Sequence, residues 1–486
     1  MSKTLRNIIL TAIVVISFGM HYRGFSKDLM SIHVWRQALT QTNIINFYEE
    51  DMNILNPRRN ERGTADGIYR LEFPLMQWLV ACLYKGFGNH LVITRIFMFI
   101  TGLFSILGLY KLLLALFHDI TPAVIGAWAF NFSPSFFYYT INPLPDNFAL
   151  CTGIWGLALF FTWLNNKKGT TLLFSGIFLS IGTLCKLPFI IYYTVPFIYF
   201  IRMLLKNGIS KKIFFQAFTV CGFIMLPLAW YSWVIPAWSG NPTVMGMADN
   251  QSSAGKIFDY LQHNLISNLP ELLLNYGSLL FFLAGFYFLK KYRAFKDSRF
   301  PLIFALSIMA LAYYFFEINT IGKVHDYYLF PFYPLLFMLV AYGAYHLYYS
   351  KIRFLRILTI ALLLLLPVTC HLRMQKRWDP DSPGLNKDLL RYKTELQNAV
   401  PRNALVVVGN DPTHAVFLYY INKKGWSFQD DSLPVTRLEQ LAAAGAQYLY
   451  TDSEKIDFNS GYDCCIGKLV AEKGSIRVFS LRNSNP

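Results

Sequence analysis

Charged residues are scarce in this sequence. Asp, Glu, Lys and Arg make up 15% of the 486 residues, whereas soluble domains usually hold about 25%. Hydrophobic residues make up 54% and aromatic residues 17%. The scarcity of charge excludes an ordinary soluble globular protein, and the composition indicates a protein that crosses a membrane many times.

Metal-binding and phosphate-binding motifs are also missing. The seven cysteines form no C-x-x-C or Cys/His metal spacing, and most of them lie within apolar segments; Cys464 and Cys465 are adjacent and outside any predicted span. The stretch "VVVGNDPTH" contains a single Gly, which is too few for a phosphate-binding loop. The sequence therefore gives no direct sign of a metal or nucleotide site.

Long apolar runs are abundant. A membrane-spanning helix needs about 20 mostly apolar residues, and about eleven segments approach this length. They are 7–25, 92–117, 122–141, 147–164, 170–187, 188–201, 213–235, 270–289, 301–317, 328–349 and 353–370. The first lacks a small-residue cleavage site, so we expect an uncleaved helix. The short apolar segment 73–88 opens with "FP", so that a proline stands at its start. We expect it to form an interfacial or re-entrant helix.

Acidic residues are outnumbered by basic ones, 28 against 44. Nucleic-acid binding is one explanation, but alternate short loops between spans, together with the N-terminus, hold sixteen basic residues against two acids, Asp119 and Asp297, and basic residues in such loops set membrane orientation. The sixteen are Lys3, Arg6, Lys167, Lys168, Arg202, Lys206, Lys211, Lys212, Lys290, Lys291, Arg293, Lys296, Arg299, Lys351, Arg353 and Arg356. We expect these loops and the N-terminus in the cytoplasm. Residues 26–91, 236–269 and everything after 370 then lie outside.

The chain changes character after residue 370. Residues 379–486 alternate strand-like stretches such as "ALVVVG" and "QYLYTD" with helical ones such as "TRLEQLAAAG". This alternation predicts a small, partly parallel α/β sheet. We therefore expect a polytopic helical domain over 1–370, with 26–91 as its first outer loop, and a soluble α/β domain over 379–486.

The first outer loop carries a polar cluster in "IHVWRQALT". In a helix over 31–48, His33, Arg36, Gln37 and Thr40 share one face, beside an apolar stripe that includes Trp35. One interpretation is a helix anchored along the membrane surface. The other is a site for a phosphorylated lipid, because a guanidinium matches phosphate oxygens.

Further ionisable residues fall at the outer ends of predicted spans. These are Glu72 in "LEFPLMQW", Asp146 in "INPLPDNFALC", Lys186 in "GTLCKLPF", and Lys323, His325 and Asp326 in "GKVHDYYLFPFYP". Each has an ordinary explanation: Asp146 as a helix N-cap, Lys186 as a snorkelling lysine, Tyr327 and Tyr328 as interface residues, and Glu317 as a partner for Lys323. Charges at a membrane boundary are costly, however, and usually have a partner or a task.

These motifs, with "TRIFMF" and "SPSFFYYTINPLPDNFAL", resemble the GT-C superfamily of membrane glycosyltransferases, which use a polyprenyl-phosphate-linked sugar as donor. Within that superfamily the chain resembles bacterial relatives of the protein O-mannosyltransferases and of the lipid A aminoarabinose transferase. The resemblance covers roughly residues 1–370. It implies a GT-C-like fold and transfer of a hexose or pentose, typically with inversion, to an acceptor on the outer face of the bacterial inner membrane.

The resemblance also implies roles for particular residues. We expect Glu72, Asp146 or His33 to act as base or to orient the acceptor. Donor-phosphate contacts are expected from Arg36, Gln37, Lys186, Lys323, His325 and Tyr327. Two departures from the family pattern affect these roles. Many relatives have an Asp shortly before the shared Arg, where this chain has Ser31 or His33, and the aminoarabinose transferases have a Lys where this chain has Phe73.

The expected partners are a polyprenyl-phosphate sugar, an acceptor lipid, glycan or protein, and the membrane, with no nucleic acid. A divalent metal would be compatible with the acids and His, but Arg and Lys contacts suffice for a lipid monophosphate, so we expect none. The alternatives are a transporter or flippase for a lipid-linked glycan, and an oligosaccharide ligase. A transporter usually shows internal repeats and charges at mid-membrane, and the sequence shows neither.

Overall fold

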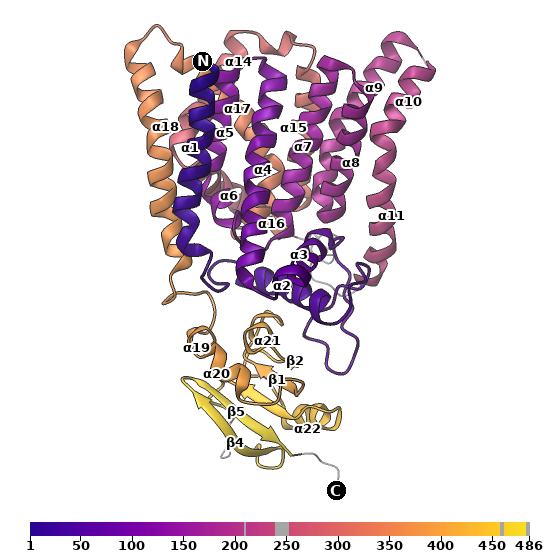
Figure 1. The fold of residues 1–486 in the computed structure, drawn as a ribbon, viewed down its shortest axis with the longest axis vertical. Coiled ribbons are helices and arrows are strands. Elements are labelled where there is room, and N and C mark those ends of the chain that lie inside the picture. Colours follow the sequence, from indigo (N-terminus) through magenta and orange to yellow (C-terminus); the bar gives the residue numbers. More distant parts are fainter. Residues whose placement is uncertain (209, 239–251, 457–460, 483–486) are drawn as a thin grey trace. The chain divides into compact units, whose positions relative to one another are not determined.

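The computed structural model describes residues 1–208, 210–238, 252–456 and 461–482, and it divides into two units (Figure 1). The helical unit comprises Met1–Phe25, Leu71–Phe73 and Thr94–Met374. The α/β unit comprises Ser26–Arg70, Pro74–Ile93 and Gln375–Pro486. The first long loop thus groups with the C-terminal domain, whereas the sequence analysis assigned residues 26–91 to the membrane domain. Part of the predicted outer loop 236–269 lies outside the described residues.

The helical unit is built from long apolar helices joined by shorter turns. In chain order its elements are α1 (Lys3–His21), η1 (Tyr22–Gly24), α4 (Leu91–Phe117), α5 (Ile120–Asn131), α6 (Pro134–Tyr139), α7 (Pro145–Asn166), α8 (Gly169–Cys185), η2 (Leu187–Tyr193), α9 (Thr194–Asn207), α10 (Lys211–Cys221), η3 (Gly222–Ile224), α11 (Met225–Val234), η4 (Ile235–Trp238), α13 (Ala254–His263), η5 (Asn264–Leu273), α14 (Gly277–Lys291), η6 (Ala294–Lys296), α15 (Phe300–Phe316), α16 (Ile318–Ile321), η7 (Asp326–Phe332), α17 (Tyr333–Tyr348) and α18 (Arg353–Met374).

The number of spans differs from the eleven expected. Among the described residues, 7 helices are long and apolar enough to cross a membrane, or up to 8 if the pair Ala254–Leu273 and Gly277–Lys291, bent by 112°, forms one span. The predicted span 122–141 breaks into α5 and α6 ahead of Pro134. Helices α8 and α15 have 17 residues each, about 25 Å, which is short for a hydrocarbon core of about 30 Å.

Close helix packing depends on small residues. Helix α14 packs against α17, and α7 packs against α8. A Cβ on Gly285 would lie 2.5 Å from the Leu339 carbonyl oxygen. The backbones of α14 and α17 therefore approach more closely than any side chain would allow.

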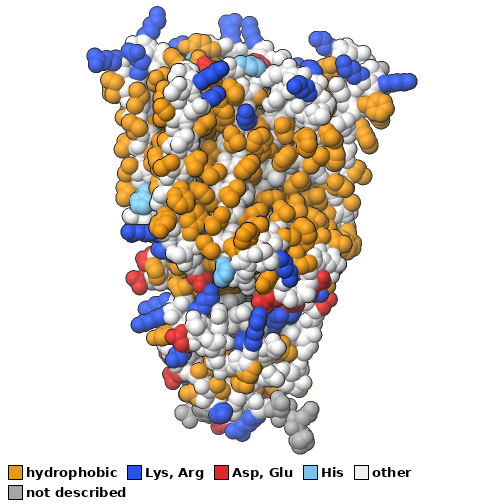
Figure 2. Space-filling view, in the orientation of Figure 1, with side chains coloured by type: hydrophobic (Ala, Val, Ile, Leu, Met, Phe, Trp, Pro, Cys, Tyr) orange, Lys and Arg blue, Asp and Glu red, His pale blue; other side chains and the backbone are white. Residues whose placement is uncertain are grey.

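The two ends of the helical unit differ in charge. Lys and Arg side chains gather at the end where the chain begins (Figure 2). Helix α7 starts beside Asp146 and ends at Lys167, so these residues lie about 30 Å apart along the helix axis. We call the end with Lys167 the basic end and the end with Asp146 the acidic end.

The α/β unit combines the first long loop with the C-terminal sheet. Its elements are α2 (Val34–Glu49), α3 (Leu75–Phe87), η8 (Gln375–Trp378), α19 (Lys387–Arg391), α20 (Lys393–Asn398), β1 (Leu405–Gly409), α21 (Val416–Ile421), β2 (Lys424–Ser427), α22 (Val435–Ala443), β3 (Tyr448–Thr451), β4 (Ile466–Lys473) and β5 (Ile476–Leu481). The short helix predicted over 73–88 is α3, which packs against α2.

The sheet confirms the prediction of a partly parallel α/β unit. Its strand order is β2-β1-β3-β5-β4. Strand β1 is parallel to β2 and β3, with Val407 opposite Trp426 and Leu449, and β5 is antiparallel to β3 and β4. Helix α21 ends at Ile421, because Asn422 adopts a left-handed conformation, and β2 begins at Lys424.

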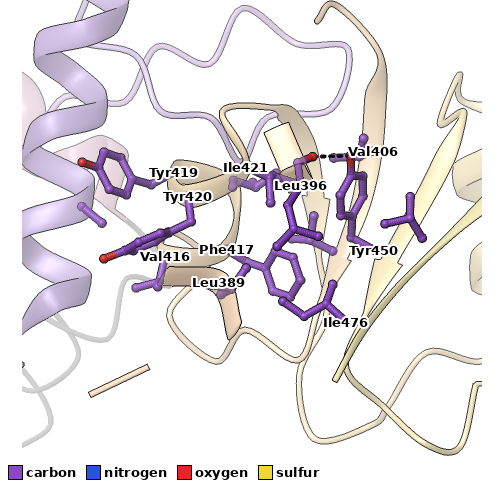
Figure 3. Packing of buried hydrophobic residues seen from close by; sticks show 14 of the residues in the cluster. Leu389, Leu396, Val406, Val416, Phe417, Tyr419, Tyr420, Ile421, Tyr450 and Ile476 are labelled. Carbon is purple, nitrogen blue, oxygen red and sulfur yellow. Dashed lines mark hydrogen bonds between the residues drawn. The ribbon is translucent and has the colours of Figure 1, made fainter. Parts of the chain in front are cut away.

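One core of the α/β unit includes the start of α2. Val34 and Ala38 are buried together with Phe417 and Tyr420 of α21, and the Tyr450 hydroxyl donates a 3.0 Å hydrogen bond to the Leu396 carbonyl in the same core (Figure 3). Apolar residues of α2 are thus used for protein packing. This packing does not test the interpretation of the helix as a membrane-surface anchor, which stays a prediction.

Glu50 links the first long loop to the sheet. Arg62 donates hydrogen bonds of 2.9 Å to both carboxylate oxygens, and Lys424 of β2 pairs with the same group. Burial raises the pKa of Glu50, but the hydrogen bonds from Arg62 and Lys424 outweigh it, so the pKa lies below its usual value.

Glu50→Gln is therefore expected to reduce stability in a pH-dependent way. The carboxylate is partly exposed and screened, so we expect a loss of roughly 1 kcal/mol at pH 7. Because the pKa of Glu50 is lower in the folded state than in the unfolded state, its carboxylate stabilises the fold fully at pH values above the unfolded-state pKa. This stabilisation disappears as the pH falls through the folded-state pKa. Thermal unfolding of the purified protein at pH 7 and in acid checks this. The control is Glu49→Gln, which removes a carboxylate whose ion-pair partner, Arg402, is exposed. A difference that does not narrow in acid would contradict the assignment.

Candidate functional site

A buried ion pair lies at the acidic end of the helical unit. Asp146 stands in the first turn of α7, directly after Pro145, which starts the helix. Its side chain is buried, and Oδ1 lies 3.2 Å from Nζ of Lys186. Removing only one partner of a buried ion pair leaves the other charge uncompensated, which strongly destabilises the protein. The two residues therefore form one electrostatic unit.

Lys186 is positioned by a break between two helices. It follows the last residue of α8 in an extended conformation, and Pro188 then opens η2. Its ammonium lies 4.7 Å from the ring centroid of Tyr328 and 5.8 Å from that of Tyr327, which is within cation–π range. Lys186 therefore faces a carboxylate and two aromatic rings rather than lying along the lipid surface.

Asp326, which directly precedes the two tyrosines, is fixed by hydrogen bonds from α6. This buried carboxylate accepts hydrogen bonds of 2.8 Å from the Ser135 hydroxyl and 2.9 Å from the Tyr139 hydroxyl. Ser135 and Tyr139 belong to the "SPSFFYY" stretch, so α6 fixes the start of η7. We assign Asp326 a positioning role for Tyr327 and Tyr328.

The loop that carries Asp146 is held from the other side by a buried arginine. Arg95 of "TRIFMF" on α4 donates hydrogen bonds of 2.8 Å to Asn142 Oδ1 and 3.1 Å to the Ile141 carbonyl. A fully buried guanidinium is costly without such partners. The conformation of "INPLPD" thus depends on a residue 46 positions earlier in the chain.

Glu72 lies at the same end of the helical unit. The residues on either side of it are hydrogen-bonded to helices of this unit. The Phe73 amide donates to the Leu184 carbonyl at 3.0 Å, and the Trp230 indole donates to the Leu71 carbonyl at 3.1 Å. The charges of Glu72 and Asp146 both act on Tyr231. The structure therefore brings the two predicted carboxylates near one tyrosine.

Glu317 and His325 complete this cluster. Burial raises the pKa of Glu317, partly offset by a hydrogen bond with Thr320 and the charge of Lys186. Burial also lowers the pKa of His325, and the charge of Lys186 acts in the same direction. His325 Nδ1 lies 2.7 Å from the Thr320 carbonyl oxygen, which only accepts, so Nδ1 carries the proton of the neutral ring.

Lys323 is not part of the cluster. It pairs with Asp259 of α13 at 2.7 Å, and both side chains are about half exposed. The suggested pairing of Glu317 with Lys323 is therefore wrong, because the nearby cation whose charge acts on Glu317 is Lys186. Proximity in sequence within "GKVHDYY" did not indicate which residue faces inward.

The remaining predicted residues lie in the α/β unit. Helix α2 begins after His33, which adopts a left-handed backbone conformation with φ of 55°. His33, Arg36 and Gln37 are all buried, and the Gln37 side-chain amide donates to the Ile32 carbonyl at 3.1 Å. A buried Arg–Gln face is unusual for a surface helix. Asp28, the nearest acid before Arg36, pairs with Lys393 at 2.5 Å.

Some residues of the acidic end were not predicted as site residues, among them Tyr231, Glu317 and Arg95. Arg95 was detectable in principle, since a charge inside an apolar segment usually has a partner or a task. Tyr231 has no such signal, because one tyrosine among many aromatic residues in a span indicates nothing by itself.

The cluster offers two chemical capabilities. Carboxylates can accept a proton from a hydroxyl, and a lysine ammonium can stabilise a phosphate that gains charge. Within the described residues, one group of a carboxylate and two cysteines has its ligand atoms close enough to share a metal ion. It consists of Glu439, Cys464 and Cys465 and contains none of the predicted site residues.

Comparisons with known proteins agree with this description. Residues 72–233, which include Glu72, Asp146 and Lys186, match a family model described as dolichyl-phosphate-mannose-protein mannosyltransferase. No curated protein sequence matches the chain.

Solved structures match it along its length. The chain is similar to ArnT from Cupriavidus metallidurans in the apo state, with a TM-score of 0.66, 11% identity and 97% of each chain covered. It is also similar to the archaeal oligosaccharyltransferase AglB from Archaeoglobus fulgidus, with a TM-score of 0.60, 13% identity, and 93% of this chain and 70% of that chain covered.

At these identities the structural matches establish the fold alone, and the family model matches less than half of the chain, residues 72–233. The resemblance predicted from the sequence is confirmed by both: the chain has the fold of the GT-C membrane glycosyltransferases.

Proposed function

We propose that this chain transfers a sugar from a polyprenyl-phosphate-linked donor to an acceptor on the outer face of a bacterial inner membrane, with inversion. The observation that carries the proposal is the buried Asp146–Lys186 pair, which lies near Glu72 at one end of the helical unit. An ArnT structure contains undecaprenyl phosphate, and that class of lipid is the carrier we propose for this chain. The basic end would face the cytoplasm.

The reaction requires a base and a stabilised leaving group. A carboxylate takes the proton of the acceptor hydroxyl, and the acceptor oxygen bonds to the anomeric carbon. The bond from that carbon to the phosphate oxygen breaks, and its electron pair leaves with the polyprenyl phosphate. General-base assistance contributes about 10²–10⁴-fold, so the loss of the base should be easily measured.

Glu72 and Asp146, which both belong to the helical unit, are two candidates for base, and His33 is the third. We assign Lys186 to the phosphate, because its ammonium is held between Asp146 and the rings of Tyr327 and Tyr328. His325 was predicted as a phosphate contact. Its lowered pKa favours the neutral ring, so we assign it to hydrogen bonding rather than to charge.

Arg36 and Gln37 are proposed to contact the donor phosphate from α2. Arg36→Lys is expected to raise the KM for donor by about 10-fold or more with little change in thermal stability, since lysine keeps the charge but loses the planar fork. Initial rates at varied donor concentration check this. Lys393→Arg is a control within the same unit. An unchanged KM in Arg36→Lys would contradict the phosphate role.

The function is tested by supplying purified protein in nanodiscs with radiolabelled polyprenyl-phosphate sugars, both hexoses and pentoses, and envelope extracts as acceptor. We expect one donor to release polyprenyl phosphate in step with labelled product. Movement of intact donor between leaflets, without release of lipid phosphate, would support a flippase. Turnover of an oligosaccharide diphosphate donor alone would support a ligase.

No metal is required by this proposal, since Lys186 and Arg36 supply positive charge. Chelation of divalent ions is therefore expected to leave transfer unchanged, and the sugar-transfer assay with a chelator checks it. The α/β unit is proposed to bind or orient the acceptor, which can be a lipid, a glycan or a protein.

A further inference from the structure

The basic end of the helical unit contains a cavity of about 710 Å³. It is lined by residues from the ends of α7, α9 and α15 and from the turn after α4. They include Lys167, Tyr199, Arg202, Lys206, His118 and Arg299. Lys167 ends α7 and Asp146 begins it, so this cavity lies at the opposite end of that helix from the proposed transfer site.

Three of the lining cations are held in position by the protein. Lys167 lies 4.7 Å from the Trp163 ring centroid and donates to the Tyr199 hydroxyl at 3.4 Å. The Arg202 guanidinium donates to the Ser298 carbonyl at 3.1 Å. Arg299 contacts His118 Nε2 at 2.9 Å.

The charge of the cavity is strongly positive. Lys167, Arg202, Lys206 and Arg299 line it, and none of the carboxylates in the described part of the chain does. Arg299 is offset by Asp297, which pairs with it at 2.7 Å, and this leaves three cationic side chains in excess. Cations held this close together repel one another, and an anion placed among them relieves that repulsion.

The cavity also has an apolar rim. Leu164, Met203 and Leu302 line it, and Leu205, another lining residue, is 83% exposed. An exposed leucine beside lysine and arginine on a spanning helix places the opening at the boundary between hydrocarbon and head groups. A soluble anion would require only the cations, whereas a phospholipid uses both the cations and the apolar rim.

We propose that this cavity binds the phosphate head group of an anionic phospholipid, with the acyl chains along the apolar rim. Lys167, Arg202 and Lys206 supply the charge, and basic pockets between spanning helices suit such head groups. The site is distinct from the donor site at the acidic end and does not depend on the proposed transfer activity.

The test measures lipid retention by native mass spectrometry of the full chain after exchange from micelles with equal phosphatidylglycerol and phosphatidylcholine. We expect wild type to retain phosphatidylglycerol preferentially. Arg202→Gln/Lys206→Gln should reduce that preference by about 10-fold or more, since each cation near an anionic surface contributes substantially. The control is Lys211→Gln/Lys212→Gln, which removes the same charge from exposed positions that do not line the cavity.

Two outcomes would overturn the proposal. An equal loss of preference in the control would show a general charge effect, and no preference in wild type would show that no lipid site exists. A separate arm adds inorganic phosphate and a soluble diphosphate at millimolar concentration. If these displace phosphatidylglycerol fully, the cavity is a site for soluble anions and the lipid assignment is wrong.

Discussion

Asp146→Asn is expected to lower the rate of sugar transfer by about 10³-fold, within the range that general-base or charge-orienting carboxylates contribute. The residue is 1% exposed, and its carboxylate oxygen Oδ1 lies 3.2 Å from Nζ of Lys186. The substitution keeps the shape of the side chain but removes its charge. Both the capacity to accept a proton and the fixed position of the Lys186 ammonium would be lost.

Stability must be separated from chemistry in this variant, because a buried lysine without its counter-charge can cost about 3–5 kcal/mol. The double variant Asp146→Asn/Lys186→Met removes both charges and should recover much of the thermal stability. If the pair were only structural, activity would recover with it. We expect the double variant to be stable and inactive; a stable and active double variant would contradict a role in transfer.

The matched control for this pair is Asp259→Asn, which breaks the exposed pair with Lys323 at the same end of the unit. Exposed pairs contribute about 0–1 kcal/mol, so we expect nearly wild-type stability and turnover. A large loss of turnover in this control would show that Lys323 belongs to the site after all.

Glu72→Gln is expected to produce the second large effect, a fall in kcat of about 10²–10⁴-fold with little change in the KM for donor. The backbone around Glu72 is fixed by hydrogen bonds of Leu71 and Phe73 to α11 and α8. The substitution should therefore leave the local structure intact. Because a base acts on the acceptor rather than on the donor, donor binding should be preserved.

The measurement is a full set of initial rates for Glu72→Gln with both substrates varied, together with donor binding to the inactive variant. Glu271→Gln, which breaks the pair with Arg373 in the same unit, is the control for a lost carboxylate. An unchanged kcat would remove Glu72 from the proposed machinery. A raised donor KM with unchanged kcat would assign it to donor binding instead of proton transfer.

Sequence reasoning succeeded where a pattern is repeated or chemically costly. Apolar runs located the long helices, and the alternation of strand and helix over 379–486 located the sheet. The carboxylate of Asp146 and the ammonium of Lys186 were singled out because charges at a membrane boundary need partners. Their pairing across two helices was not deducible from the sequence, since neither residue has a neighbour in the chain that points to the other.

The errors have physical causes. Hydropathy does not reveal bends, so the break before Pro134 and the 112° bend after Leu273 were counted as straight spans. Helical periodicity placed Arg36 and Gln37 on one face but did not show that this face is buried. Lys323 and Lys186 were equivalent as sequence signals, and packing alone made one exposed and the other buried.

The proposed transfer site is tested most directly by mapping where a polyprenyl phosphate with a photoreactive group on its first isoprene unit attaches to the full chain. Excess phosphatidylglycerol is present so that the basic cavity is occupied. We predict cross-links near Lys186 and within residues 317–328, which Asp146→Asn/Lys186→Met should abolish. Cross-links confined to the basic end, around Lys167 and Arg202, would contradict the proposed transfer site.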